Sequence, residues 1–242
     1  MAENGICKLK KMLHYNSYES LSIAAAHFFT VACQRSVAAH DQFTVALSGG
    51  NTPKRLYELL ATPEFGSNIN WKKVFVFFSD ERYVPHTDAE SNFNMASKAL
   101  LQHIPIPKKN IFAIPVSSTP AKDALAYEAA VKQITGNAKF AFDLVLLGMG
   151  ADGHTASLFP GNEILQEKRR VVKEVFVKEK NMYRISFTLP LLNRAKQILL
   201  LVSGDGKKEI LKKVFAKRKT TKPFPVQLLK GDITWMVSQA SA

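Results

Sequence analysis

Cysteine is scarce in this chain, which has only Cys7 and Cys33 among its 242 residues. Two cysteines do not make a disulfide framework, so we expect a reducing compartment. No apolar run approaches the roughly 20 residues that a membrane-spanning helix needs. The N-terminal residues lack the apolar stretch of a secretory signal. These absences argue against secreted, fibrous and integral-membrane proteins, and they favour a cytoplasmic protein that has no membrane partner.

Acidic residues are also few, 20 against 33 Lys and Arg, which gives a formal net charge of +13. Residues 207–222 alone contain eight Lys or Arg and one Glu. Ile210, Leu211, Val214 and Phe215 fall on one helical face there, so the simplest interpretation is a helix with a solvated basic surface. The alternatives are an electrostatic funnel for a small anionic substrate and a nucleic-acid surface. Because paired-Cys zinc signatures and aromatic-interleaved basic runs are missing, we expect no nucleic-acid partner.

Short apolar runs alternate with helical patterns along the chain, in which 46% of the residues are hydrophobic. The apolar runs predict strands at residues 43–47, 74–78, 111–114, 142–147, 171–177, 184–189 and 197–202. The helical patterns lie at residues 18–38, 53–61, 91–101, 119–134 and in the basic segment. Strands that are apolar throughout and separated by helices predict an α/β fold with a mainly parallel sheet covered on both faces. We expect one domain over residues 1–242, with a small appended lobe at about 160–195.

The first polar cluster, at the end of a predicted strand, contains Ser48, Gly49, Gly50 and Thr52. In open parallel sheets, ligands bind at the carboxyl ends of the strands. Two glycines between a strand and a helix let the backbone approach an anionic or polyhydroxylated ligand, and the helix start adds free N–H groups. The same glycines also suit a plain turn. Thr52 is the predicted N-cap and Pro53 the first helical residue. This cluster is neither a GxxxxGK[ST] loop nor a GxGxxG fingerprint, so it implies no nucleotide cofactor.

The second cluster, Asp80, Glu81 and Arg82, follows the predicted strand at residues 74–78. The two carboxylates could do acid–base work, and Arg82 could bind an oxyanion or a phosphate. A charged loop with an internal ion pair is an equally simple structural interpretation.

The third cluster places Asp152 and His154 in a glycine-rich turn, GMGADGH, after the predicted strand at residues 142–147. An imidazole titrates near neutrality and can accept a proton from water, and a nearby carboxylate can orient it. This pair is therefore the catalytic candidate. No second His or Cys stands at metal-ligand spacing, so we expect no metal site. Gly-x-Ser-x-Gly is absent as well, which argues against a covalent serine mechanism.

Two isolated cations complete the candidates. Arg184 opens a predicted strand, and Lys207 lies in a strand-to-helix turn. Both could bind a phosphate at the same edge of the sheet. An isolated Arg or Lys is more often a surface residue, so neither would be chosen without the neighbouring clusters.

Four segments of the chain carry a resemblance to a known family. They are ALSGGNTPKRLYELL (46–60), NWKKVFVFFSDERYVPHTDAESNFNMASKALL (70–101), FDLVLLGMGADGHTASLFPG (142–161) and RISFTLPLLNRAKQILLLVSGDGKKEIL (184–211). In these motifs and their order the chain resembles the 6-phosphogluconolactonase family, which is related to the glucosamine-6-phosphate deaminases. The resemblance implies a Rossmann-like, three-layer α/β/α fold. It also implies hydrolysis of 6-phospho-D-glucono-1,5-lactone to 6-phosphogluconate, a step of the oxidative pentose phosphate pathway, with no cofactor. We expect a monomer whose partner is a small phosphosugar lactone.

The resemblance also implies roles for individual residues. His154 is the general base that activates water, Asp152 stands beside it, and the phosphate is bound by Arg184 and Lys207. The sugar-phosphate cradle is formed by Ser48, Gly49, Gly50 and Thr52. Asp80 and Arg82 lie at its rim. The oxyanion donor is either Arg82 or the backbone N–H groups of the glycine-rich turns.

The closest alternative is the deaminase branch, which opens and isomerises an amino-sugar phosphate. That branch carries a Glu five residues after the His, whereas this chain has Phe159 at that position. Without the carboxylate the ring-opening reaction lacks its acid–base partner, so we favour the lactonase. A non-catalytic sugar-phosphate binding protein is the remaining alternative, and it would bind its ligand without turnover.

Overall fold

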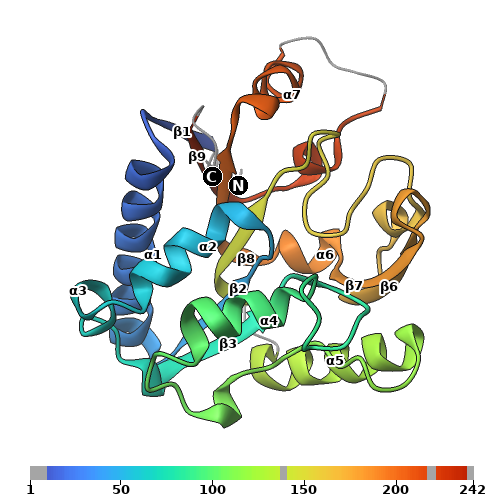
Figure 1. Ribbon diagram of the computed structural model, residues 1–242. Helices are drawn as coiled ribbons and strands as arrows, with labels where there is room; N and C mark the ends of the chain where they lie inside the picture. Colours follow the sequence, from blue (N-terminus) through green and yellow to red (C-terminus); the bar gives the residue numbers. More distant parts are fainter. Residues whose placement is uncertain (1–9, 137–140, 217–221, 239–242) are drawn as a thin grey trace, which may run out of the picture.

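The computed structural model describes residues 10–136, 141–216 and 222–238 (Figure 1). Its main sheet has six strands, all paired in parallel, in the order β1 (Lys10–Tyr15), β9 (Asp232–Ser238), β8 (Ala195–Ser203), β5 (Phe142–Gly148), β2 (Phe43–Leu47) and β3 (Val74–Phe78). The α-helices are α1 (Tyr18–His40), α2 (Asn51–Leu60), α3 (Pro63–Gly66), α4 (Asn92–Ala96), α5 (Pro120–Thr135), α6 (Leu189–Leu192) and α7 (Lys208–Val214).

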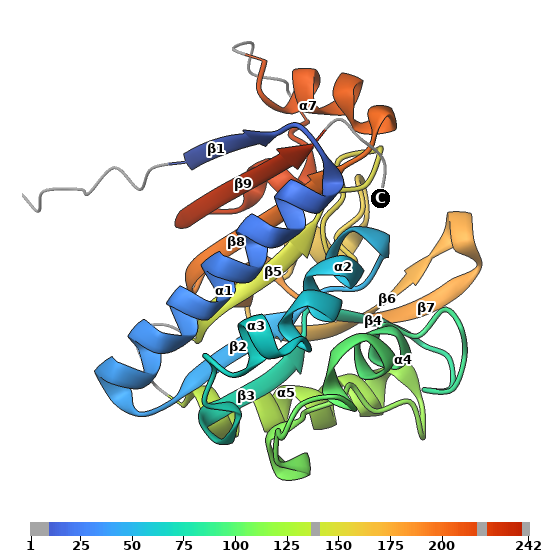
Figure 2. The same ribbon diagram turned by 60° about the vertical axis from the view of Figure 1, so that its left-hand side comes forward.

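Both faces of the main sheet are covered. α1 and α2 lie on one face, and α5 and a second, antiparallel sheet lie on the other (Figures 1 and 2). The second sheet has the strand order β4 (Asp80–Arg82), β7 (Met182–Phe187) and β6 (Val172–Val177). These layers confirm the predicted α/β/α fold with a mainly parallel sheet. Within the described residues, no helix combines the length and apolar character needed to cross a membrane.

Aromatic side chains join the layers. Phe29 of α1 packs edge-on against Phe43 of β2, with ring centroids 5.3 Å apart. Tyr127 of α5 stacks on Phe187 of β7, which in turn packs against Phe142 of β5. β2 is buried along its whole length, and so are all residues of β5 except the last. This burial explains why both strands are mostly apolar. Their two buried polar side chains pair with each other, since the Asp143 carboxylate accepts from the Thr44 hydroxyl at 2.9 Å.

The predicted elements agree with the structure to within about two residues, with a few corrections. Residues 111–114 are not a strand, because Ile111 makes only a single bridge, to Val76. The helix after the glycine-rich turn begins at Asn51 with Gly50 as its N-cap, so Thr52 lies inside the helix and does not cap it. β1, β4 and β9 were not predicted, since their pairing depends on partners far away in the sequence.

The small sheet corresponds in part to the predicted lobe. β6 and β7 fall within residues 160–195, but β4 comes from residues 80–82. Because the sheet draws on two distant segments, it is tied to the rest of the fold. The single domain over residues 1–242 remains a prediction.

The basic segment forms a shorter helix than expected. α7 ends at Val214, and residues 217–221 lie outside the described residues, as does Cys7. Ile210 and Val214 are buried as predicted, whereas Phe215 is 40% exposed and packs on Trp235.

Two buried tyrosines complete the hydrogen bonding at the carboxyl ends of neighbouring strands. The Tyr57 hydroxyl accepts from the Ser48 N–H (3.0 Å) and donates to the Ser48 C=O (2.8 Å). The Tyr127 hydroxyl accepts from the Phe78 N–H (2.8 Å) and donates to the Phe78 C=O (3.1 Å). Each hydroxyl satisfies both backbone groups of one residue where no strand pairs with them. Burial raises the pKa of both phenols, so they stay neutral and keep the proton that they donate.

We expect Tyr57→Phe to lower the free energy of unfolding by about 1–3 kcal/mol, because it leaves a buried N–H and a buried C=O without partners. Tyr127→Phe is the matched control, because it removes the same two hydrogen bonds at Phe78. Urea denaturation of the two variants measures both losses. A loss below about 0.5 kcal/mol in both would contradict this role for the hydroxyls.

Candidate active site

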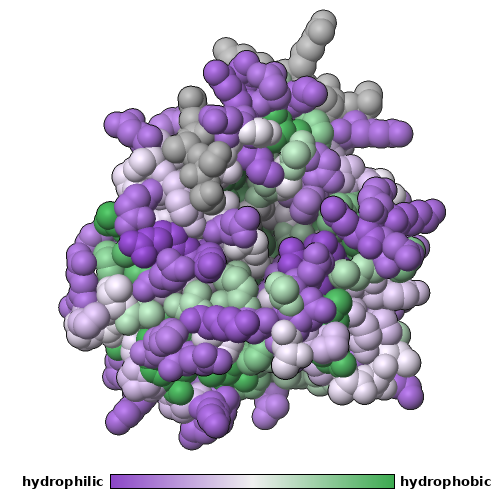
Figure 3. Space-filling model, viewed as in Figure 1, coloured by the Kyte–Doolittle hydropathy of each residue, from purple (hydrophilic) through white to green (hydrophobic). Residues whose placement is uncertain are grey.

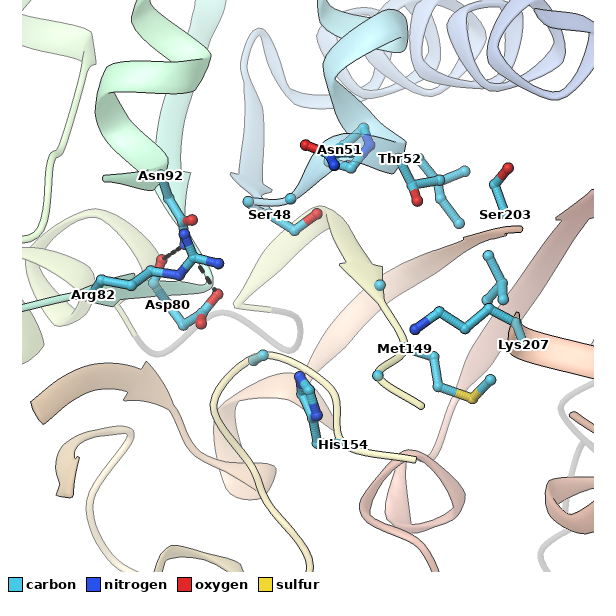
Figure 4. A pocket seen from close by; sticks show the side chains of 18 of the residues that line it. Ser48, Asn51, Thr52, Asp80, Arg82, Asn92, Met149, His154, Ser203 and Lys207 are labelled. Carbon is cyan, nitrogen blue, oxygen red and sulfur yellow. Dashed lines mark hydrogen bonds between the residues drawn. The ribbon is translucent and has the colours of Figure 1, made fainter. Parts of the chain in front are cut away.

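A pocket opens at the carboxyl ends of β2, β5 and β8, beside the small sheet (Figure 4). On the surface it is a hollow among hydrophilic side chains (Figure 3). Nine of the ten candidate residues line it, and the tenth, Asp152, is hydrogen-bonded to one of them, His154. The lining residues are Ser48, Gly49, Gly50, Asn51, Thr52, Pro53, Asp80, Arg82, Asn92, Gly148, Met149, Gly150, His154, Ala156, Arg184, Leu201, Val202, Ser203 and Lys207.

The glycine-rich turn presents the start of α2 to the pocket. Gly50 has a φ of 94°, in the left-handed region that favours glycine, and it caps the helix without a side chain. The first N–H groups of α2 therefore have no capping side chain. Such groups, together with the partial positive charge of a helix start, favour an anion.

Asn92 closes this part of the pocket and was not predicted from the sequence. Its side chain is buried, and its Nδ2 donates to the Asp80 backbone carbonyl at 2.8 Å. Its Oδ1 lies so close to Gly49 that a Cβ on Gly49 would stand only 1.7 Å from it. The absent side chain at Gly49 thus makes room for Asn92. Asn92 does not follow a strand, so the strand-end rule could not identify it.

Glu81 has a structural position instead of the acid–base position considered above. It is 1% exposed and is not part of the pocket lining. Its carboxylate accepts from the backbone N–H groups of Asn92 (2.6 Å) and Phe93 (2.8 Å) and from the Ser91 hydroxyl (3.0 Å). Burial raises the pKa of Glu81, although these hydrogen bonds oppose the shift. Glu81 therefore anchors the start of α4.

Asp80 and Arg184 form a buried pair at one wall. The Arg184 Nη1 lies 3.9 Å from the Asp80 Oδ2, which also accepts from the Ser157 hydroxyl at 2.7 Å. Burial lowers the pKa of Arg184, and the Asp80 carboxylate opposes that shift. Arg82 stands directly opposite Arg184 in the ladder between β4 and β7. Two guanidinium groups thus share this wall, and the Nε of each is buried without a hydrogen-bond partner among the described residues.

His154 and Lys207 occupy the other side. The His154 Nδ1 lies 2.5 Å from the Asp152 Oδ1, and the imidazole is 29% exposed. Burial raises the pKa of Asp152, but the interaction with His154 outweighs it and leaves this pKa below its usual value. Burial lowers the pKa of Lys207, which Asp152 partly opposes. Figure 4 shows Lys207 and Arg82 pointing into the pocket from opposite sides, with His154 between them.

The glycine-rich turn before His154 is as tightly fitted as the one at Gly49. A Cβ on Gly150 would lie 2.1 Å from the His154 Nδ1 and 2.6 Å from the Asp152 Oδ1. The pair therefore folds over a position that only glycine can occupy. Among the residues that the structure describes, no three His, Cys, Asp or Glu side chains are grouped so that they could hold a metal ion.

We expect Gly49→Ala to lower the free energy of unfolding by about 1–3 kcal/mol, because the new methyl group must displace the Asn92 side chain. Gly206→Ala is the control, since a Cβ there meets no heavy atom within 4 Å. In an Asn92→Ala background the cost of Gly49→Ala should fall, which urea denaturation of the double-mutant cycle measures. Equal costs in the two backgrounds would contradict the assigned contact.

Known proteins resemble this chain over most of its length. The sequence model of the glucosamine-6-phosphate isomerases/6-phosphogluconolactonase family matches residues 16–235. A 6-phosphogluconolactonase of Synechocystis sp. is 38% identical over 216 residues, covering 87% of this chain and 88% of that protein. A 6-phosphogluconolactonase of Haemophilus influenzae is 36% identical over 200 residues, covering 81% and 85%.

The fold is similar to solved structures as well. The 6-phosphogluconolactonase from Trypanosoma cruzi superposes with a TM-score of 0.85 and 31% identity, covering 98% of this chain and 97% of that one. On sequence and on structure, the chain belongs to the glucosamine-6-phosphate isomerase/6-phosphogluconolactonase family.

Proposed function

We propose that this protein hydrolyses 6-phospho-D-glucono-1,5-lactone to 6-phosphogluconate, with His154 as the general base. The lactonase names of its relatives support the reaction. The observation that carries the mechanism is the pair of Asp152 and His154 in a pocket that also holds Lys207 and Arg184.

The Asp152 carboxylate orients the base. Because it binds Nδ1 of His154, that nitrogen carries the proton, and Nε2 is the nitrogen left to accept one. A water molecule between Nε2 and the lactone carbonyl carbon can then attack C1 while it gives a proton to the imidazole. Asp152 stabilises the imidazolium that forms. General-base assistance of this kind contributes about 10²–10⁴-fold in rate.

The tetrahedral intermediate collapses by breaking the bond between C1 and the ring oxygen. The imidazolium returns its proton to that oxygen, which leaves a hydroxyl group and a carboxylic acid. The acid then loses its proton to water and becomes the carboxylate of the product. The negative charge on the former carbonyl oxygen needs fixed donors, and Arg82 and the backbone N–H groups of the glycine-rich turns are the two candidates. No step needs a covalent intermediate or a metal.

The cations and the start of α2 suit the phosphate. Lys207 and Arg184 supply positive charge in the pocket, and Gly50, Asn51 and Thr52 bring the N-terminal end of α2 to it. Charge-assisted hydrogen bonds from these groups would hold the substrate at a fixed distance from His154. We further propose that the protein acts as a cytoplasmic monomer on this small substrate, without a nucleic-acid or membrane partner.

The deaminase alternative is weaker on a specific observation. The side chain five residues after His154 is the Phe159 ring, whose centroid lies 4.2 Å from that of the imidazole. An aromatic ring there can neither donate nor accept the proton that opening an amino sugar requires. The non-catalytic alternative would leave the orientation of His154 by Asp152 without a purpose.

The test of the function is lactone hydrolysis, with the lactone produced in the assay by glucose-6-phosphate dehydrogenase. We expect 6-phosphogluconate to form well above the spontaneous rate and glucosamine 6-phosphate to release no ammonia. Ammonia release alone would favour the deaminase. Binding of 6-phosphogluconate without any turnover would favour the non-catalytic protein.

In the same assay we expect His154→Ala to lower kcat by about 10²–10⁴-fold, because a general base acts in the transition state. The affinity for 6-phosphogluconate, measured by titration calorimetry, should change far less. His103→Ala is the control, since this exposed imidazole interacts with the Lys98 carbonyl and is not part of the pocket lining. Turnover near that of the wild type would remove His154 from the mechanism.

A further inference from the structure

Phe159 contacts both His154, the proposed general base, and Arg184, a proposed phosphate-binding residue. Its ring centroid lies 4.2 Å from that of the His154 imidazole, with 32° between the ring planes. On the same ring, the Arg184 guanidinium carbon lies 5.5 Å from the centroid. Both of these neighbours line the pocket, whereas Phe159 is not part of its lining. One aromatic side chain behind the pocket wall therefore contacts the base and a phosphate-binding cation at once.

The other contacts of His154 leave its orientation incomplete. The hydrogen bond to Asp152 fixes one atom of the imidazole, and a ring held at one atom can still rotate about that hydrogen bond. The Asp152 side chain is 47% exposed, so water competes for its carboxylate. A ring packed against the imidazole face prevents this rotation, and such aromatic pairs add attraction beyond the area they bury.

Arg184 is held loosely by its charged partner as well. The separation of 3.9 Å between its Nη1 and Asp80 is long for a charge-assisted hydrogen bond, and its Nε is buried without a partner. A guanidinium within about 6 Å of an aromatic centroid is attracted to the ring face. The Phe159 ring therefore supplies a contact that the ion pair does not.

The chain fixes Phe159 in this place through the turn that precedes it. Ala156 has a φ of 46°, a left-handed conformation that non-glycine residues rarely adopt. The Leu158 N–H donates to the Thr155 carbonyl, and the Ser157 hydroxyl donates to the Asp80 carboxylate. With Leu158 fully buried, the turn is anchored on both sides, and Phe159 is directed back over His154.

We propose that Phe159 is a positioning residue that fixes the His154 imidazole and the Arg184 guanidinium in place relative to each other. The proposal rests on the lactonase function proposed above. Since the ring touches the base and the cation, its loss affects both the chemical step and substrate binding. If Phe159 served only the stability of the fold, replacing it would lower the melting temperature without moving His154.

The experiment compares Phe159→Leu, which keeps apolar bulk, with Phe159→Tyr, which keeps the ring. We expect Phe159→Leu to lower kcat about tenfold and to raise KM about threefold, since small displacements of catalytic groups are costly. Phe159→Tyr should stay within about threefold of the wild type in both constants. The control is Phe176→Leu, a 39% exposed phenylalanine of β6 that packs on Tyr183 and is not part of the pocket lining.

A second measurement does not depend on turnover. In NMR spectra the Phe159 ring current should shift the carbon-bound protons of the His154 imidazole, and this shift should vanish in Phe159→Leu but persist in Phe159→Tyr. Were the wild type inactive on the lactone, the proposed function would fail while these signals still decided the position of His154. Unmoved His154 signals in Phe159→Leu would overturn the proposal. Equal losses of activity in the Leu and Tyr variants, or in Phe176→Leu, would overturn it too.

Discussion

The pocket depends on how the buried carboxylate of Asp80 is satisfied. A charged group removed from water is costly unless charges or donors surround it. Asp80 is 5% exposed, and its carboxylate lies 2.7 Å from the Ser157 hydroxyl and 3.9 Å from the Arg184 guanidinium. It also accepts, at 3.5 Å, from the Ser79 hydroxyl and from the Asn92 Nδ2. Asn92 adds a hydrogen bond to its backbone carbonyl. Three segments that lie far apart in the sequence, the turn after His154, β7 and α4, are thereby joined to β4.

Three cationic side chains and one carboxylate line the pocket, and a second carboxylate is hydrogen-bonded to His154. Arg82, Arg184 and Lys207 bring positive charge to the cavity. The Asp80 carboxylate lies beside Arg184, and the Asp152 carboxylate is hydrogen-bonded to His154. On the proposed function, this excess of positive charge would attract the phosphate of the substrate. The carboxylate that is hydrogen-bonded to His154 is not the one that pairs with Arg184.

Glycine and its neighbours set the fine geometry. The Asn92 side chain occupies the space that a Cβ on Gly49 would need. The side chains of Asp152 and His154 likewise occupy the space beside Gly150. In both places a strand ends and the backbone passes close to a side chain that lines the pocket. From the sequence, Gly49 and Gly50 were expected to let a ligand approach the backbone. The structure shows that Gly49 and Gly150 also admit the protein's own side chains, which the spacing of residues in the sequence could not reveal.

The sequence by itself determined most of the strands and helices, though not β1, β4 and β9, and the positions where a parallel sheet exposes polar residues to a ligand. These features follow from local apolar runs and from the strand-end rule, so the clusters at residues 48–52, 80–82 and 152–154 could be found without a structure. Arg184 and Lys207 were chosen only because of these clusters and the family resemblance. Only the tertiary structure decided that Glu81 anchors α4, that Asn92 closes the pocket and that Phe159 contacts both His154 and Arg184. Each of these contacts depends on which side chains from distant parts of the sequence pack together, and no local sequence pattern specifies that packing.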